Sequence, residues 1–253
     1  MQIKRIVRFL DSLIGSPLVR LFSKISRLRT IILVNRYKKS SEINFQVIFP
    51  APQNDELTKL LVHYGSDKAS LFDTKIENSG HKYSYFYRSL FSTYRDKHFN
   101  FLEFGIDKGA SLRAWSDYFP KADIFGVDYK REFLFNTGRI STFEVDMYSP
   151  LSLKNFVSLM NERKFEIVID DGPHDFLSTK TAWESCLPTF ADKFIYVCED
   201  IPMRELESYS KFFEEEASRL GLNFYFVFFN QKDWPKELHG SNDYNTLGVL
   251  TRF

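Results

Sequence analysis

Residues 102–111 read Leu-Glu-Phe-Gly-Ile-Asp-Lys-Gly-Ala-Ser, in the order strand, glycine turn and helix start. Gly105 and Gly109 allow a positive φ and a close approach between backbone and ligand, and Ser111 can cap the helix. The spacing GxxxG is neither the dinucleotide-binding GxGxxG nor a phosphate-binding loop that ends in Gly-Lys-Ser/Thr. A tight turn without a ligand can have similar residues. Whether this turn belongs to a binding site therefore depends on the segments around it.

Short apolar runs alternate with amphipathic stretches from Phe99 onward. We expect strands at residues 99–104, 123–127, 142–145, 165–169, 194–198, 223–229 and 246–251. Helical patterns cover residues 57–64, 111–118, 133–138, 151–163, 178–190 and 203–220. Because repeated β-then-α units form parallel sheets, we predict an α/β fold. It is a Rossmann-like, seven-stranded and mostly parallel sheet, with helices on both faces and a C-terminal antiparallel strand.

Composition narrows the class of protein. The 253 residues are 43% hydrophobic and 26% charged, which excludes a disordered or collagen-like chain. Cys186 and Cys198 lie in apolar segments without CxxC spacing, so a disulfide scaffold and a structural zinc are disfavoured. This cysteine usage indicates a reducing compartment, and we expect a cytoplasmic protein.

The first 40 residues differ in charge from the rest. They contain ten Lys/Arg against one acid, Asp11, a net charge of +9. Apolar residues recur every three or four positions, so we predict a basic amphipathic helical segment at 1–40, preceding the fold. Arg5, Arg8 and Asp11 interrupt the run that a signal peptide needs, and no stretch reaches the roughly 18 apolar residues of a membrane span. The segment can lie on the inner face of an anionic membrane, bind a partner, or pack on its own core or a second subunit.

Turn formers and charges mark residues 37–56 as a linker. We therefore divide the chain into the basic segment 1–40, a linker and helical cap over the site at 41–98, and the main domain at 99–253.

Acidic residues come at the ends of the first three strands of the main domain: Glu103, Asp128 and Asp146. Ligands of open α/β sheets bind at the carboxyl ends of the strands. Asp128 follows Gly105 by 23 residues, near the spacing at which an acid accepts hydrogen bonds from ribose hydroxyls. An acidic rim suits a nucleoside with a cationic or hydroxyl-rich part and repels a pyrophosphate.

The next two strands end in Asp170-Asp171-Gly172-Pro173-His174 and in Glu199-Asp200. Four carboxylates at one sheet edge repel one another, so a divalent cation is expected among them. Oxygen ligands favour Mg²⁺, Mn²⁺ or Ca²⁺ over zinc. His174 follows Asp171 across a Gly-Pro turn, where it can act as a base near the cation.

With these motifs the chain resembles class I S-adenosylmethionine-dependent methyltransferases. More narrowly, it resembles the metal-dependent O-methyltransferases of macrolide sugars and the cephalosporin-hydroxylase-like group. The resemblance spans about residues 60–253, makes the main domain at 99–253 a methyltransferase domain, and rests most on Asp-Asp-Gly-x-His and Glu-Asp. It implies metal ligands at Asp171, Glu199 and Asp200, and catalysis by Asp171 and by His174 as general base. The implied cofactor site consists of Glu103, Gly105, Gly109, Ser111, Asp128, Asp146, Met147 and Asp170.

Tyr64-Gly65-Ser66-Asp67-Lys68 and the later His81-Lys82-Tyr83 and Tyr87 resemble a segment that precedes the fold in the same relatives. The resemblance implies that these residues close over cofactor and substrate, and we assign His81 and Tyr83 to the substrate. Two departures are visible. Pro173 stands where relatives often carry Ser, and residues 1–40 have no counterpart in the macrolide enzymes.

The resemblance implies an O-methyltransferase with S-adenosylmethionine and Mg²⁺ or Mn²⁺. We expect the acceptor to be a sugar hydroxyl, in a nucleotide-linked sugar or a surface polysaccharide precursor, and we expect no nucleic-acid partner. Relatives are often multimers, which implies a homo-oligomer.

Three alternatives stay open. They are a methyltransferase of another small-molecule hydroxyl such as a natural product, a non-catalytic scaffold of the same fold, and an iron-dependent hydroxylase. The hydroxylase needs two histidines with one carboxylate, and His174 is the one histidine at the strand edge.

Overall fold

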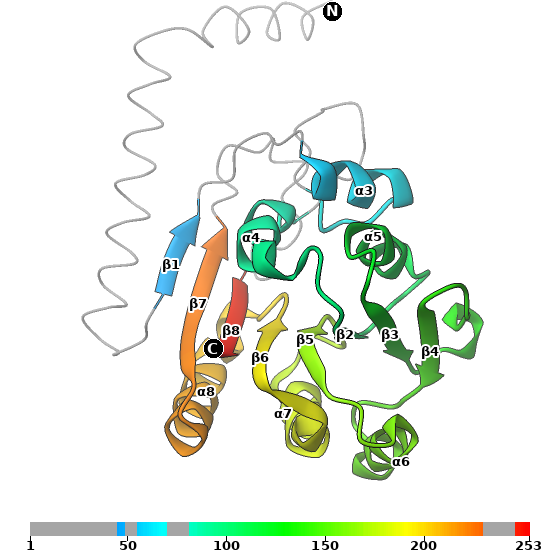
Figure 1. Cartoon of the computed structure of the whole chain (residues 1–253). Coiled ribbons are helices and arrows are strands. Elements are labelled where there is room, and N and C mark those ends of the chain that lie inside the picture. The colour runs from blue at the N-terminus through cyan, green and yellow to red at the C-terminus, as the bar shows by residue number, and fades with distance from the viewer. Residues whose placement is uncertain (1–44, 49–54, 70–80, 230–245) are drawn as a thin grey trace, which may run out of the picture.

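The computed structural model describes residues 45–48, 55–69, 81–229 and 246–253. Its centre is an eight-stranded sheet with the order β1-β7-β8-β6-β5-β2-β3-β4 (Figure 1). The strands are β1 (Phe45–Ile48), β2 (Asn100–Phe104), β3 (Asp123–Asp128), β4 (Ile140–Glu144), β5 (Phe165–Asp170), β6 (Phe190–Cys198), β7 (Asn223–Phe229) and β8 (Thr246–Arg252). Strand β8 runs antiparallel to both of its neighbours, and the other pairs are parallel. The expected α/β architecture is confirmed, with one more strand than predicted.

Strand order reverses between β2 and β5. From β2 the chain proceeds outward through β3 and β4, and from β5 it proceeds in the other direction to β6. The carboxyl ends of β2 and β5 therefore border the crevice in which open α/β sheets bind ligands.

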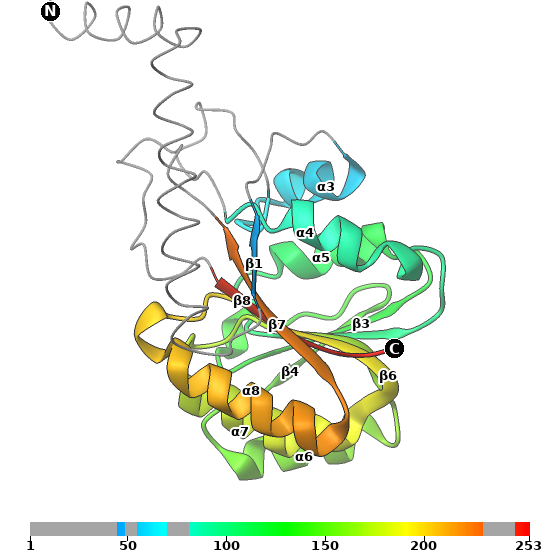
Figure 2. The same cartoon turned by 90° about the vertical axis from the view of Figure 1, so that its left-hand side faces the viewer.

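Helices cover both faces of the sheet (Figure 2). One face carries α3 (Glu56–Tyr64), α4 (Ser84–Leu90) and α5 (Ala110–Tyr118), and the other carries α6 (Pro150–Met160), α7 (Phe176–Cys186) and α8 (Leu206–Leu220). Because successive strand side chains point to opposite faces, Phe101 belongs to the core under α5 and Leu102 to the core under α7. The sheet is thus packed between two aromatic-rich cores.

Several predicted boundaries need correction. The strand that the sequence analysis did not predict, β1, lies within residues 37–56, which we expected to be a linker. The helix predicted at 133–138 is wrong, since a 3₁₀ helix at Arg131–Phe133 leads into a turn with Gly138 at φ +54°. There Thr142 N–H donates to the Asn136 side chain, so the turn is bonded to β4. Helix α7 ends at Cys186 because Pro188 cannot continue its hydrogen-bond ladder, and β6 begins at Phe190.

The predicted helical segment at 1–40 lies outside the described residues. Among the described helices, none combines the length and the apolar character that crossing a membrane requires.

Candidate functional site

The turn after β2 and the end of β5 are in direct contact. Asp171 N–H donates to the Phe104 carbonyl oxygen at 2.9 Å, and Gly105 N–H donates to the Val127 carbonyl oxygen at 2.9 Å. Gly105 has φ +76°, and a Cβ atom there would lie 2.1 Å from the Asp171 carbonyl oxygen. Glycine is thus required at this position for both its conformation and its size.

Asp128 connects the end of β3 to the same turn. Its Oδ2 accepts hydrogen bonds from the backbone N–H groups of Ile106 at 3.1 Å and Asp107 at 3.2 Å. Its Oδ1 accepts from Lys130 N–H at 2.9 Å. The carboxylate is therefore fixed at the crevice between neighbouring strands.

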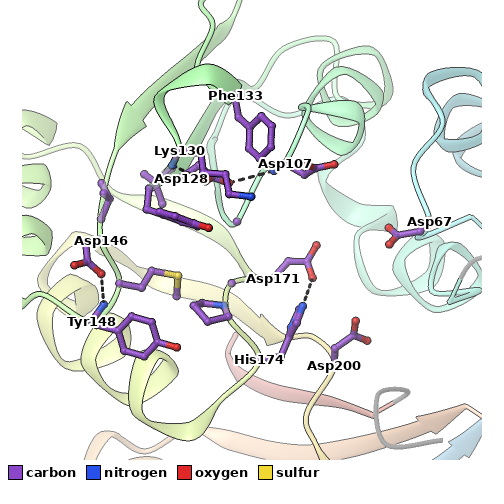
Figure 3. A pocket seen from close by; sticks show the side chains of 17 residues that line it. Asp67, Asp107, Asp128, Lys130, Phe133, Asp146, Tyr148, Asp171, His174 and Asp200 are labelled. Atoms are coloured by element: carbon purple, nitrogen blue, oxygen red, sulfur yellow. Dashed lines mark hydrogen bonds and ion pairs between the residues drawn. The ribbon is translucent and has the colours of Figure 1, made fainter. Parts of the chain in front are cut away.

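A pocket of about 740 Å³ opens at this point of the sheet. Six aspartates line it: Asp67, Asp107, Asp128, Asp146, Asp171 and Asp200. Aromatic and apolar side chains add Val127, Tyr129, Phe133, Val145, Met147 and Tyr148. Asp146 lies toward one side with Tyr148, whereas Asp171, His174 and Asp200 gather toward the other (Figure 3). The pocket thus has two chemically distinct parts.

Asp171, His174 and Asp200 form one group. Ligand atoms of the three lie within 4.8 Å of one another, an arrangement that could hold a metal ion. His174 Nε2 lies 4.0 Å from Asp171 Oδ1. The backbones of His174 and Asp200 are left-handed, with φ of +57° and +53°, as often found where strain is retained at functional sites.

The residues that we assigned to the substrate contact this group through Asp200. Tyr83 OH donates to Asp200 Oδ1, and His81 Nδ1 lies 3.4 Å from the same oxygen. Burial, and then the charge of Asp200, raise the pKa of Tyr83. At neutral pH Tyr83 is therefore a hydrogen-bond donor to the carboxylate.

Glu199 lies behind the pocket and is not one of its lining residues. Its Oε1 accepts from Tyr87 OH at 2.5 Å, and its Oε2 accepts from Lys68 Nζ at 2.8 Å. Burial raises the pKa of Glu199 well above its ordinary range, although Lys68 opposes this effect. Of the three predicted metal ligands, the structure brings Asp171 and Asp200 to the pocket and holds Glu199 beneath them.

The predicted cofactor residues also divide into two sets. Gly105, Asp128, Asp146 and Met147 line the pocket, whereas Glu103, Gly109, Ser111 and Asp170 do not. Asp170 is buried and accepts a hydrogen bond from Tyr196 OH at 2.7 Å. Burial raises the pKa of Glu103 to about 7, against the lowering effect of the Lys68 charge.

Sequence reasoning missed some of the pocket. Tyr129 and Tyr148 line it although each is at least half exposed, and no motif distinguishes them from surface tyrosines. Tyr129 directly follows Asp128, and Tyr148 follows Asp146 by two residues. This closeness to the strand-end acids is the signal that could have found both tyrosines.

No family model matches the chain. The curated relatives include two enzymes of Streptomyces olivaceus. An 8-demethyl-8-alpha-L-rhamnosyl tetracenomycin-C 2'-O-methyltransferase is 29% identical over 57% of this chain and 37% of that protein. The corresponding 3'-O-methyltransferase of the 2-methoxy-rhamnosyl compound is 30% identical over 58% of this chain and 37% of that protein. The chain therefore spans under two fifths of the length of these relatives.

Among solved structures, one similar fold is the MycE methyltransferase from the mycinamycin biosynthetic pathway, in complex with Mg, SAH and mycinamycin VI. It superposes with a TM-score of 0.56 and 20% identity, covering 79% of this chain and 55% of that chain. The fold, the strand-end site and the sequence similarity agree with one another. The chain is a protein of the class I S-adenosylmethionine-dependent methyltransferase fold, and its sequence is similar to that of sugar O-methyltransferases.

Proposed function

We propose that the chain is a divalent-cation-dependent O-methyltransferase that moves a methyl group from S-adenosylmethionine to a sugar hydroxyl. The observation that carries this proposal is the two-part pocket at the switch point of the sheet. One part offers Asp128 and Asp146 with aromatic side chains, and the other offers Asp171, His174 and Asp200. The relatives named as sugar O-methyltransferases support the same activity.

The first part of the pocket fits the cofactor. Asp128 can accept hydrogen bonds from ribose hydroxyls, and Tyr129 and Met147 offer apolar surface to a flat base. An acidic lining attracts the cationic sulfonium and amino groups. Glycine at 105 lets the backbone approach the ligand closely.

The second part fits a divalent cation. Two carboxylates and an imidazole converge there, and hard oxygen ligands suit Mg²⁺ or Mn²⁺. We assign Asp171 and Asp200 as ligands from the pocket side, with Glu199 as the third carboxylate beneath them. A bound cation lowers the pKa of a hydroxyl that it coordinates and fixes its direction.

His174 serves as the general base in this proposal. Its Nε2 takes the proton of the attacking sugar hydroxyl while the oxygen forms a bond to the methyl carbon. The carbon–sulfur bond breaks and its electron pair stays on sulfur, which loses its positive charge. Asp171, 4.0 Å from Nε2, stabilises the imidazolium that forms.

The charge of the pocket bears on the acceptor. The lining contains six aspartates, and its basic side chains are Lys130 and His174. This excess of negative charge disfavours the binding of a pyrophosphate, even with a divalent cation and the sulfonium of the cofactor bound. We therefore rank a sugar of a glycan precursor or glycoside above a nucleotide-linked sugar. The relatives named above act on rhamnosyl groups of a larger molecule.

A mass-spectrometric screen tests the proposal. The full chain is incubated with S-adenosylmethionine, Mg²⁺ and matched pairs of acceptors, each sugar offered as a neutral glycoside and as its nucleotide diphosphate. A gain of one methyl group that excess chelator abolishes and Mn²⁺ or Mg²⁺ restores supports it. Turnover that persists in excess chelator would refute the requirement for a divalent cation. A preference for the nucleotide-linked sugar would refute the ranking of acceptors. Calorimetry that finds NAD binding but no binding of SAH would refute the cofactor.

A further inference from the structure

Lys68 is a buried cation that contacts carboxylates at the carboxyl ends of three strands. Its side chain is 2% exposed, and its Nζ forms ion pairs with Glu103 at 3.5 Å, with Glu199 at 2.8 Å and with Asp171. Burial lowers the pKa of Lys68, but the three carboxylates raise it by more, so the ammonium stays charged. Lys68 thus lies at the junction of β2, β5 and β6, directly under the pocket.

The backbone holds Lys68 in this place. Ser84 N–H donates to the Lys68 carbonyl oxygen at 3.0 Å, and Lys68 N–H donates to Ser66 Oγ at 3.3 Å. Ser84 is the first residue of α4, which also carries Tyr87, the hydroxyl donor to Glu199. The ammonium and this hydroxyl therefore come from one layer that is packed on the strand ends.

The two oxygens of Asp171 have different neighbours. Oδ2 accepts a hydrogen bond from Lys68 Nζ, and Oδ1 is the oxygen nearest His174 Nε2. Both oxygens of Glu199 have donors from the same layer, Lys68 and Tyr87. Rotation of the Asp171 carboxylate would break its ion pair with the buried Lys68 ammonium, which is costly because it leaves that charge unpaired. The ion pair between Lys68 and Oδ2 thereby fixes the direction in which Oδ1 of Asp171 points.

We propose that Lys68 is a positioning residue that orients the carboxylates of Asp171 and Glu199 and thereby determines the affinity of the pocket for a divalent cation. This inference rests on the proposed function, because it requires that the pocket binds a cation. It goes beyond that function by assigning a role to a residue that does not line the pocket and that acts through the carboxylates it contacts.

A competing role makes the opposite forecast. If Lys68 were only a counter-charge, it would compete with the metal for the same carboxylates, and its removal would strengthen cation binding. If it orients the carboxylates, its removal weakens binding, by about 10- to 100-fold as for other partners of metal ligands. The sign of the change in affinity separates the two roles.

The experiment measures Mn²⁺ binding by electron paramagnetic resonance on the full chain, without donor or acceptor. We expect Lys68→Met to raise the Mn²⁺ dissociation constant at least tenfold, with a cooperative thermal transition as evidence of folding. The matched control is Lys180→Met, which removes a surface lysine paired with Glu184 at 3.8 Å and leaves Mn²⁺ binding unchanged. Equal or tighter Mn²⁺ binding by Lys68→Met overturns the proposal.

A second variant covers the case in which Lys68→Met does not fold. In Lys68→Met/Glu103→Gln the buried ammonium and the Glu103 carboxyl that it pairs with are removed together, so Glu103 cannot be left as a buried carboxylate without its cation. The same tenfold or greater weakening supports the proposal, and affinity at or above that of the unaltered chain overturns it. If the unaltered chain itself binds no Mn²⁺, the metal assignment of the proposed function fails, and this inference fails with it.

Discussion

The close contact between the β2 turn and the end of β5 can be tested by adding one methyl group at Gly105. In Gly105→Ala the new Cβ atom meets the Asp171 carbonyl oxygen at 2.1 Å, the Asp171 carbonyl carbon at 2.7 Å and the Gly172 Cα at 2.9 Å. All three are backbone atoms, so no side-chain rotation relieves the clash. The strand end must retreat by about 0.9 Å before the shortest contact reaches 3.0 Å, the limit that such atoms tolerate.

The free-energy cost has two parts. The left-handed φ of +76° costs an alanine about 1–2 kcal/mol, and the overlap adds about 1–3 kcal/mol. Gly138→Ala is the matched control, because Gly138 has φ +54° and no atom within 4 Å of its added Cβ, so it incurs the first part alone. We expect Gly105→Ala to lose about 2 kcal/mol more free energy of unfolding than Gly138→Ala.

The assay is urea unfolding of both variants, with SAH calorimetry as the functional readout. Because displacement of Asp171 and Gly172 deforms the pocket, SAH affinity should fall at least tenfold in Gly105→Ala and stay unchanged in Gly138→Ala. Equal losses of stability in the two variants, together with normal SAH binding by Gly105→Ala, would show that the two strand ends are not in contact as described.

Three further predictions concern the base, pH and the first 40 residues. His174→Ala should lower kcat by about 10²–10⁴ and retain Mn²⁺ binding, and a matching loss of Mn²⁺ affinity would make His174 a ligand instead. Because burial raises the pKa of Glu103 from 4.5 to about 7, the folded chain keeps a proton that the unfolded chain releases. The stability from this group is complete below pH 4.5 and is lost as pH rises through about 7, by about 3 kcal/mol. Urea titrations across this range should show the decline and should find it reduced in Glu103→Gln; an equal decline in both would refute it. Basic residues near an anionic surface contribute about 1 kcal/mol each, so the full chain should float with anionic liposomes at low salt and a variant lacking 1–40 should not. Equal flotation of the two, or none by either, leaves the segment as a packing element.

Much of the site could be predicted because its residues lie at the ends of apolar runs. In a parallel sheet those ends meet at one edge, so Asp128, Asp146 and Asp171 could be grouped from the order of the strands along the chain. Spacing along the chain does not tell which of two consecutive acids faces a ligand. Glu199 and Asp200 are such a pair. Asp200 has a left-handed backbone and lines the pocket, whereas Glu199 is buried behind the pocket.

The resemblance places Lys68 in a segment over the site, but neither its burial among three carboxylates nor strand β1 could be predicted. The acidic partners of Lys68 lie 35, 103 and 131 residues away, and a lysine in a turn is usually solvated. Its burial becomes understandable only when three strand ends are brought together around it. Strand β1 has four residues, too few to outweigh the turn formers and charges of residues 37–56, among them Pro50 and Pro52.

The antiparallel strand β8 has a consequence for the order of folding. Strands β7 and β1 connect to the parallel strands only through β8, which follows both of them along the chain. During synthesis β2 to β6 can pair as each emerges, whereas β1 and β7 have to await a segment made later. Formation of the sheet edge that carries the pocket is thus separable in time from completion of the sheet. Until β8 inserts, the outer edge of β6 stays open to pairing with another chain.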